Sequence, residues 1–344
     1  MSQATTLEQC FSMCPEKYDM SPNPITMSKR NQMNRRTFLQ SASLIPTSLA
    51  FKSLSSLGED QPQKVTGKSD AMPMVSLGGK NISRLISGSN PINGGSHLSN
   101  LVNRSMKEYF MEKNTVDYFA RCLEHGINIF QGSNIGNFEL WNGLKQDGEK
   151  RHYISLIREP TEDNPLTIEY AKKNKFLGLA HHGEVTDILF KKKELDKIVD
   201  FLKRIRDSGL QVGISTHMPD VIDYVESKGW DIDFYMACAY ERHRSAEDLK
   251  KMLGYVPLPV KEVYLQEDPP RMYKMIRQTD RVCLAFKILA AGRLCDNNQL
   301  LEKAFQDAFA GIKQKDAVIV GMFPKWTDQI EFNTGMARKY GGAV

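Results

Sequence analysis

The chain has 344 residues, and its contents of 41% hydrophobic and 25% charged residues are ordinary for a globular protein. No apolar run reaches the roughly 18 residues that a membrane-spanning helix needs, so we expect no stable membrane insertion. The formal net charge is +5, but residues 1–50 hold five basic and three acidic residues, which leaves +3 for the rest. That excess is too small to indicate binding of nucleic acid or of an anionic membrane.

Residues 1–50 resemble a twin-arginine export signal. Arg35 and Arg36 are followed by Thr-Phe-Leu and by a weakly apolar segment of small residues. An arbitrary arginine pair on a polar tail is the alternative interpretation. As a signal, this segment would be bound by the twin-arginine export machinery, and the protein would be periplasmic or otherwise exported. Residues 51–72 are rich in Ser, Lys, Asp and Gln and are predicted to be a linker.

From residue 73 to residue 344, short apolar strands alternate with helices. Gly78-Gly79 predicts a hairpin turn ahead of the first strand. Asp268, followed by two prolines, predicts the beginning of a helix. The helix predicted at 194–208 has one apolar stripe, acidic residues at its start and basic residues at its end, as expected of a helix that covers a sheet. The predicted helices are 115–125, 194–208, 247–253, 268–278 and 329–340, and the predicted strands are 82–87, 126–132, 151–157, 176–180, 211–215, 233–240, 282–288 and 316–321.

Eight strands separated by helices predict a (β/α)8 TIM barrel as a single domain, in which functional residues lie at the carboxyl ends of the strands. Three histidines follow predicted strands: His181 and His182 after one, and His217 after the next. Side chains alternate between the two faces of a strand, so only one of His181 and His182 can face the barrel mouth. We expect His181 to face the mouth and His182 to point away.

Several stretches of the predicted barrel resemble the aldo-keto reductase family, in the same order along the chain. The resemblance covers most of residues 74–340. It implies an oxidoreductase that uses NADP or NAD to act on a carbonyl or hydroxyl group of a small, sugar-like molecule. The stretches are Val75-Ser-Leu-Gly, Arg84-Leu-Ile-Ser-Gly, Gly126-Ile-Asn-Ile-Phe, Asp207-Ser-Gly-Leu-Gln-Val-Gly-Ile-Ser, Ala285-Phe-Lys-Ile-Leu-Ala-Ala-Gly-Arg-Leu, and Gln329-Ile-Glu-Phe-Asn after Gly321.

The catalytic tetrad of that family, which consists of Asp, Tyr, Lys and His, is incomplete in this sequence. Gln131 stands at the Asp position and Gly136 at the Tyr position, and the third strand ends in Ile157-Arg158 without a lysine. Only His181 matches the family pattern. The usual phenol proton donor is therefore missing, and we expect His181 to be the principal acid/base group, because an imidazole titrates near neutral pH.

Two further residues at strand ends are candidates for the missing chemistry. Lys287 lies near the end of the strand at 282–288, where an ammonium group can act as an acid/base or contact an anion. Tyr240 closes the strand at 233–240 and is the candidate for the missing phenol.

The resemblance assigns the cofactor site more fully. Ser215 matches a residue that contacts the nicotinamide amide, and Thr216 stands where the family has Asn. Phe286 matches the aromatic residue that stacks on the nicotinamide, and Asn333 matches an Asn on the adenine side. Lys325 is a candidate phosphate contact.

A barrel that lacks the tetrad is also compatible with other chemistry. His217 with His181 or His182, plus Glu267, is a candidate ligand set, but these residues come from different strands without local metal-binding spacing. The four cysteines after residue 50 show no Cys-x-x-Cys spacing either. We therefore predict no metal site. The alternative function is a metal- or acid/base-dependent lyase, hydrolase or isomerase, or a non-catalytic binding protein.

Overall fold

The computed structural model describes residues 71–144, 151–158, 166–260 and 262–342. The predicted export signal and the linker up to residue 70 lie outside the described residues, so both remain predictions. None of the helices in the described ranges is long and apolar enough to cross a membrane.

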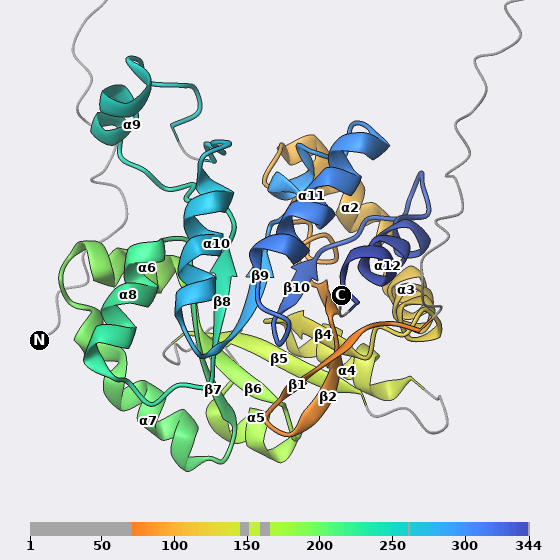
Figure 1. Cartoon of the computed structure of the whole chain (residues 1–344). Coiled ribbons are helices and arrows are strands. Elements are labelled where there is room, and N and C mark those ends of the chain that lie inside the picture. Colours follow the sequence, from red (N-terminus) through yellow and green to blue (C-terminus); the bar gives the residue numbers. More distant parts are fainter. Residues whose placement is uncertain (1–70, 145–150, 159–165, 261, 343–344) are drawn as a thin grey trace, which may run out of the picture. The chain divides into compact units, whose positions relative to one another are not determined.

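Eight parallel strands form the closed barrel that the sequence predicts (Figure 1). Consecutive strands are neighbours, and the last strand pairs with the first, Val318 opposite Leu85, to close the ring. The strands are β3 (Leu85–Gly88), β4 (Ile129–Gly132), β5 (His152–Ile157), β6 (Gly178–His181), β7 (Gln211–Thr216), β8 (Phe234–Cys238), β9 (Val282–Phe286) and β10 (Ala317–Val320).

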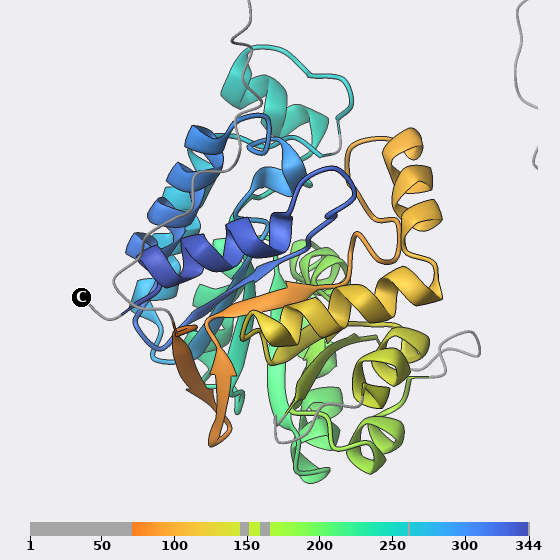
Figure 2. The ribbon, with the colours of Figure 1, turned by 90° about the vertical axis from the view of Figure 1, so that its right-hand side faces the viewer.

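A β-hairpin precedes the barrel and is formed by β1 (Met74–Leu77) and β2 (Lys80–Ser83). Gly78 and Gly79 both have positive φ angles, 56° and 71°, and form the predicted turn. The single strand predicted at 82–87 is in fact two, because β2 ends at Ser83 and β3 begins at Leu85. The hairpin lies at the end of the barrel opposite α2 and α9 (Figure 2).

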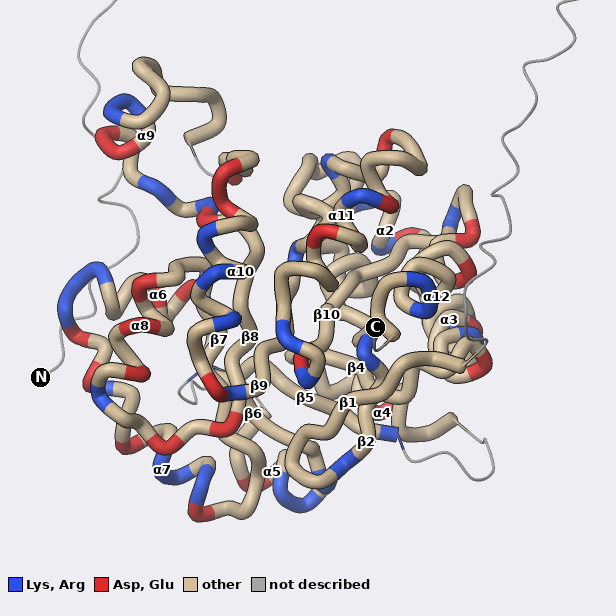
Figure 3. The backbone as a smooth tube through the Cα atoms, viewed as in Figure 1, with Lys and Arg blue, Asp and Glu red and all other residues tan. Residues whose placement is uncertain are grey.

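Helices surround the barrel, and basic and acidic residues are interspersed along them (Figure 3). The helix predicted at 194–208 begins as a short 3-10 turn and continues as an α-helix. The helical segments are α2 (Asn100–Tyr109), α3 (Glu112–Glu124), α4 (Ile135–Gly143), α5 (Ile168–Lys173), α6 (Gly183–Lys191), η1 (Leu195–Ile198), α7 (Val199–Asp207), α8 (Pro219–Lys228), α9 (Ala246–Leu253), α10 (Asp268–Gln278), η2 (Ala290–Gly292), α11 (Asn298–Gly311) and α12 (Gln329–Tyr340).

Two apolar clusters stabilise the barrel, one inside it and one between the strands and the helices. Ala180 of β6 belongs to the inner cluster, while Leu179 belongs to the outer one. Phe234 and Tyr235 of β8 divide in the same way. Burying a large apolar side chain contributes about 1.5–3 kcal/mol, so this alternation fixes which face of each strand points inward. It also fixes which residues at the strand ends can face the mouth.

Candidate functional site

A cavity of about 520 Å³ opens at the carboxyl ends of the barrel strands. Its wall includes the ends of the strands, the loop that follows β3 and the first part of α12. This volume is within the range of about 300–1,000 Å³ that small-molecule sites occupy. The cavity is therefore the place to test each residue that the sequence predicts as functional.

The structure reverses the expected orientations of the two adjacent histidines. Ala180 points into the barrel, so His181 points outward, where its Nδ1 lies 2.7 Å from Thr186 Oγ1 and its ring packs on Phe201. His182 instead lines the cavity. Burial lowers the pKa of His181 to about 4, so this imidazole is neutral at pH 7. The expectation that His181 faces the mouth was wrong by one residue.

His182 shares the cavity wall with Arg158, which follows β5. Arg158 Nη2 lies 3.4 Å from His182 Nε2, and the buried Nδ1 of His182 has no hydrogen-bond partner among the described residues. Burial and the charge of Arg158 lower the pKa of His182 to about 4. A neutral imidazole beside a guanidinium can donate hydrogen bonds to a ligand oxygen. Arg158 thus brings a positive charge to a place where the sequence offered no lysine.

Strand β7 separates the two residues that were predicted to contact the nicotinamide. Ser215 lines the cavity, as expected. Thr216 is not part of the cavity wall and donates a hydrogen bond of 2.6 Å to Asp187 Oδ1, so its position does not support the predicted cofactor role. His217, two residues after Ser215, returns to the cavity side.

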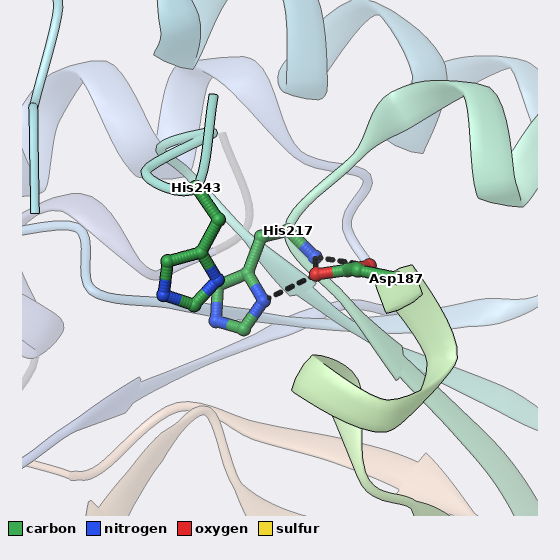
Figure 4. A group of neighbouring side chains, drawn as sticks. All are labelled: Asp187, His217 and His243. Atoms are coloured by element: carbon green, nitrogen blue, oxygen red, sulfur yellow. Dashed lines mark hydrogen bonds and ion pairs between the residues drawn. The ribbon is translucent and has the colours of Figure 1, made fainter. Parts of the chain in front are cut away.

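Asp187 of α6 binds His217 closely (Figure 4). The His217 Nδ1 lies 2.7 Å from Asp187 Oδ2, and the His217 backbone N–H lies 3.2 Å from both carboxylate oxygens. Both side chains are buried. The approach depends on Gly183 at the start of α6, because a Cβ there would lie 2.8 Å from Ser215 Oγ.

Asp187 and His217 also belong, with His243, to a group of three potential metal ligands within 4.8 Å of one another. The rings of His217 and His243 are 5.4 Å apart (Figure 4). However, Asp187 and His217 Nδ1 are already hydrogen-bonded to each other, which makes the carboxylate a partner of the imidazole rather than a free ligand. This group shares only His217 with the candidate set in the sequence, which also held His181 or His182 and Glu267.

Lys287 follows β9 and lies in the cavity wall, as predicted. Its φ angle of 58° is unusual for a residue with a side chain, and its Nζ lies 4.9 Å from the centre of the Phe286 ring. Burial lowers the pKa of Lys287 to about 8. An ammonium group with this pKa can exchange a proton near neutral pH.

Tyr240 does not supply a phenol to the cavity. Its ring lies 5.1 Å from the Tyr264 ring, it is buried, and it is not part of the cavity wall. Burial raises the pKa of Tyr240 to about 12. The prediction of Tyr240 as a catalytic residue was therefore wrong in its placement.

Of the remaining predicted cofactor residues, two lie in the cavity wall and one lies off it. Phe286 and Asn333 line the cavity, and the buried Oδ1 of Asn333 has no hydrogen-bond partner among the described residues. Lys325 lies off the cavity wall, where its Nζ is 3.0 Å from Ser105 Oγ and 5.0 Å from the centre of the Trp326 ring. Its role as a phosphate contact has no support in this position.

Sequence reasoning missed one charged group at the rim. His97 and Arg242 line the cavity, and both contact Glu262. The distance from His97 Nδ1 to Glu262 Oε1 is 3.0 Å, and Arg242 is ion-paired to the same oxygen. Burial would raise the pKa of Glu262, but His97 and Arg242 together hold it at about 2. No local motif joins these residues, because they are far apart in the sequence.

Fold and cavity define the chain as a (β/α)8 barrel with a ligand-sized site at the carboxyl ends of its strands. No family model and no curated protein matches the sequence. Solved structures similar to it include aldo-keto reductases, the family whose motifs it resembles. One from Pseudomonas aeruginosa is 16% identical, with a TM-score of 0.48 over 79% of this chain and 97% of that chain.

A holo aldo-keto reductase from Bacillus halodurans is 14% identical, with a TM-score of 0.45 over 77% of this chain and 90% of that chain. A glycerol dehydrogenase from Gluconobacter oxydans is 13% identical, with a TM-score of 0.39 over 79% and 97%. Barrel enzymes of other chemistry match as well, including an epimerase and an aldolase. At these identities the likenesses assign no activity to this chain.

Proposed function

We propose that the protein is an oxidoreductase that transfers hydride between a nicotinamide cofactor and the carbonyl or hydroxyl group of a small polar molecule. The observation that carries the proposal is the meeting of Ser215, Phe286, Asn333 and Lys287 in one cavity. These residues come from three separate parts of the chain. Three of them were assigned to the cofactor from the sequence alone, and the fourth to acid/base chemistry.

The cavity residues fit such a cofactor. Phe286 offers an aromatic face to a planar ring, and Ser215 offers a hydroxyl group to an amide. The unpartnered Oδ1 of Asn333 needs a donor, which an exocyclic amino group provides. When bound, the nicotinamide would supply or accept the hydride.

Three other cavity residues interact with the carbonyl or hydroxyl oxygen of the substrate. Lys287, with a pKa of about 8, gives a proton to the oxygen of a carbonyl that is being reduced, or accepts it in the reverse direction. Arg158 and His182 donate hydrogen bonds to the same kind of oxygen. Lys287 thus replaces the family's phenol as proton donor, and Arg158 brings the positive charge of its lysine.

Nicotinamide binding tests the proposal directly. NADPH and NADH are titrated into the protein, and the cofactor fluorescence is followed. The Phe286→Ala variant should bind more weakly by about 1–3 kcal/mol, because the aromatic contact area is lost. Lys80→Ala is the matched control, since Lys80 is exposed in the hairpin, off the cavity wall, and its loss should leave binding unchanged. A folded protein that changes the fluorescence of neither nucleotide would remove the proposal.

We propose in addition that the protein is exported through the twin-arginine route. The support is the pair Arg35-Arg36 with the apolar segment behind it. Changing both arginines to lysine keeps the charge but should leave the protein in the cytoplasm. Unchanged export of the double variant would contradict the proposal.

A further inference from the structure

Hydride transfer to a carbonyl needs one proton, and Lys287 supplies it. The cavity contains a second acid/base group that this reaction does not use, which is His217 held by Asp187. His217 and Lys287 both lie close to the same aromatic residue: the His217 ring is 5.5 Å and the Lys287 Nζ 4.9 Å from the Phe286 ring centre. A molecule at Phe286 is therefore close to two groups that can move protons.

The contacts of Asp187 determine which nitrogen of His217 is free. Asp187 accepts hydrogen bonds from the hydroxyl of Thr216 and from the backbone and Nδ1 of His217. Because a carboxylate can only accept, Nδ1 carries the proton and Nε2 keeps its lone pair. Figure 4 shows Nε2 pointing away from Asp187. No hydrogen bond to Nε2 is found among the described residues, and the residue lines the cavity.

The surrounding charges favour the same protonation state. Burial, together with the charges of Lys287 and Arg242, holds the pKa of His217 far below its usual value, so the ring is neutral. Burial raises the pKa of Asp187 to about 6, but the carboxylate is still ionised at neutral pH. A neutral imidazole that donates Nδ1–H to a carboxylate is a base at Nε2.

We propose that His217, positioned by Asp187, removes a proton from the carbon next to the carbonyl of a small α-hydroxy ketone or aldehyde, and that the cavity has this enolising activity without any nicotinamide. The Nε2 lone pair takes the proton. The electrons of the broken C–H bond form a C=C bond, and the carbonyl π electrons move to the oxygen. The ammonium group of Lys287 stabilises that negative oxygen. Return of the proton to carbon reverses the flow, so nothing is oxidised or reduced.

The charge of the cavity also limits the substrate. Lys287 and Arg158 bring positive charge, and neither forms an ion pair with a carboxylate among the described residues; Glu184 is the one carboxylate in the described cavity wall, so positive charge is in excess. Arg242 is already paired with Glu262. An α-hydroxy carbonyl compound that also carries an anionic group is therefore favoured over a neutral one.

Exchange of carbon-bound hydrogen in D2O tests the activity, with dihydroxyacetone phosphate and dihydroxyacetone as probes and no nucleotide present. Proton NMR should show faster loss of the C–H signal with the protein, and the phosphorylated probe should exchange faster. His217→Gln should slow the catalysed exchange by roughly 10²–10⁴-fold. Asp187→Asn should do the same through kcat, because an amide donates to Nδ1 and moves the imidazole proton to Nε2.

Nitrogen NMR of His217 distinguishes this positioning role from a general loss of structure. The wild type should show protonated Nδ1, and Asp187→Asn should show protonated Nε2 with an unchanged melting temperature. His243→Gln is the matched control, because His243 lies beside His217 but outside the cavity wall, and it should retain the exchange. Bound zinc that is lost in both His217→Gln and His243→Gln, with inhibition by a chelator, would replace the base by a metal site.

No exchange of either probe by the wild type would overturn the proposal, as would full exchange by Asp187→Asn. The test omits nucleotides, so its failure does not affect the proposed oxidoreductase function. Equally, absence of NADPH binding would leave the enolising activity standing.

Discussion

The two ends of the barrel differ in whether their buried polar groups have hydrogen-bond partners within the protein. At the amino end, Arg84 just before β3 is buried and donates to the backbone oxygens of Asp316, Lys313 and Gly341. The Asp316 carboxylate in turn accepts from the backbone of Cys283 and from Lys313. The Arg84 guanidinium and the Asp316 carboxylate thus both have hydrogen-bond partners within the protein, as expected of buried polar groups with a structural role.

At the carboxyl end, several groups in the cavity wall lack such partners among the described residues. They are Nδ1 of His182, Nε of Arg242 and Oδ1 of Asn333, three of the five such buried atoms among the described residues; the other two, in Tyr153 and Arg338, lie off the cavity wall. Leaving a buried polar atom unpaired costs about 1–3 kcal/mol, so a cluster of them at one place needs a reason. A bound ligand that supplies the missing partners is such a reason. On the proposed function, the polar groups at the amino end stabilise the barrel, and those at the carboxyl end bind the ligand.

The largest effect should come from Lys287 at the carboxyl end. Lys287→Met should lower carbonyl reduction by roughly 10²–10⁴-fold, because the proton donor is lost. Lys287→Arg should not restore the rate, since a guanidinium stays protonated at any working pH.

The pH profile of the wild type gives a second measurement on Lys287. Reduction should be constant at low pH and fall as the pH rises through about 8, where Lys287 loses its proton. Oxidation of the alcohol should show the opposite trend. A reduction rate that continues unchanged above that pH would show that another group gives the proton.

The next effect concerns the amino end and should be on stability alone. Arg84→Met leaves the backbone oxygens of Asp316 and Gly341 without a donor, which should lower the free energy of unfolding by about 2–6 kcal/mol, whereas Lys313 O still accepts from the backbone of Asp316. NADPH binding at temperatures where the variant is folded should not change. Lys80→Met, an exposed basic residue of β2, is the control and should have little effect. Weakened NADPH binding in folded Arg84→Met would contradict the separation of a stabilising amino end from a binding carboxyl end.

The smallest effect is the contribution of His181 to the pH dependence of stability, which His182 is not expected to match. The pKa of His181 is about 4 in the folded protein and about 6.5 when unfolded, so the unfolded state binds the proton first as the pH falls. Stability should therefore decrease as the pH drops from about 6.5 to 4, by up to an amount on the order of 3 kcal/mol for this residue. His181→Leu should remove that share of the acid sensitivity in urea unfolding and keep most of the activity.

His182→Leu serves as the opposite case. It should reduce activity, because His182 lines the cavity beside Arg158. Loss of activity in His181→Leu but not in His182→Leu would mean that the observed orientation of the two side chains is not the working one.

The barrel was predictable from sequence because its signals are local. The Asp-Pro-Pro start and the apolar spacing predicted α10 at 268–278, and α12 at 329–340 was equally clear. The strand predicted at 82–87 shows the limit of such signals. The chain leaves the hairpin at Ser83 and enters the barrel at Leu85, and nothing in the apolar run marks this break.

The site was only partly predictable, because its geometry depends on strand register. A shift of one residue exchanges the faces of His181 and His182, and nothing near them in the sequence fixes the inward face. In β7, the alternation of side chains between the two faces of a strand places Thr216 on the opposite face from Ser215 and His217. The sequence therefore contained the information needed to exclude Thr216 from the cavity. The partnership of Asp187 with His217 depends on how closely α6 approaches β7, which is a tertiary contact.

Amide hydrogen exchange with and without saturating NADPH tests the division between the two ends most directly. Binding at the carboxyl end should slow exchange around Ser215, Phe286 and the first turns of α12, and leave the amides near Arg84 and Asp316 unchanged. Saturating NADPH that protects no amide at the carboxyl end, or that protects mainly the amino end, would contradict the account.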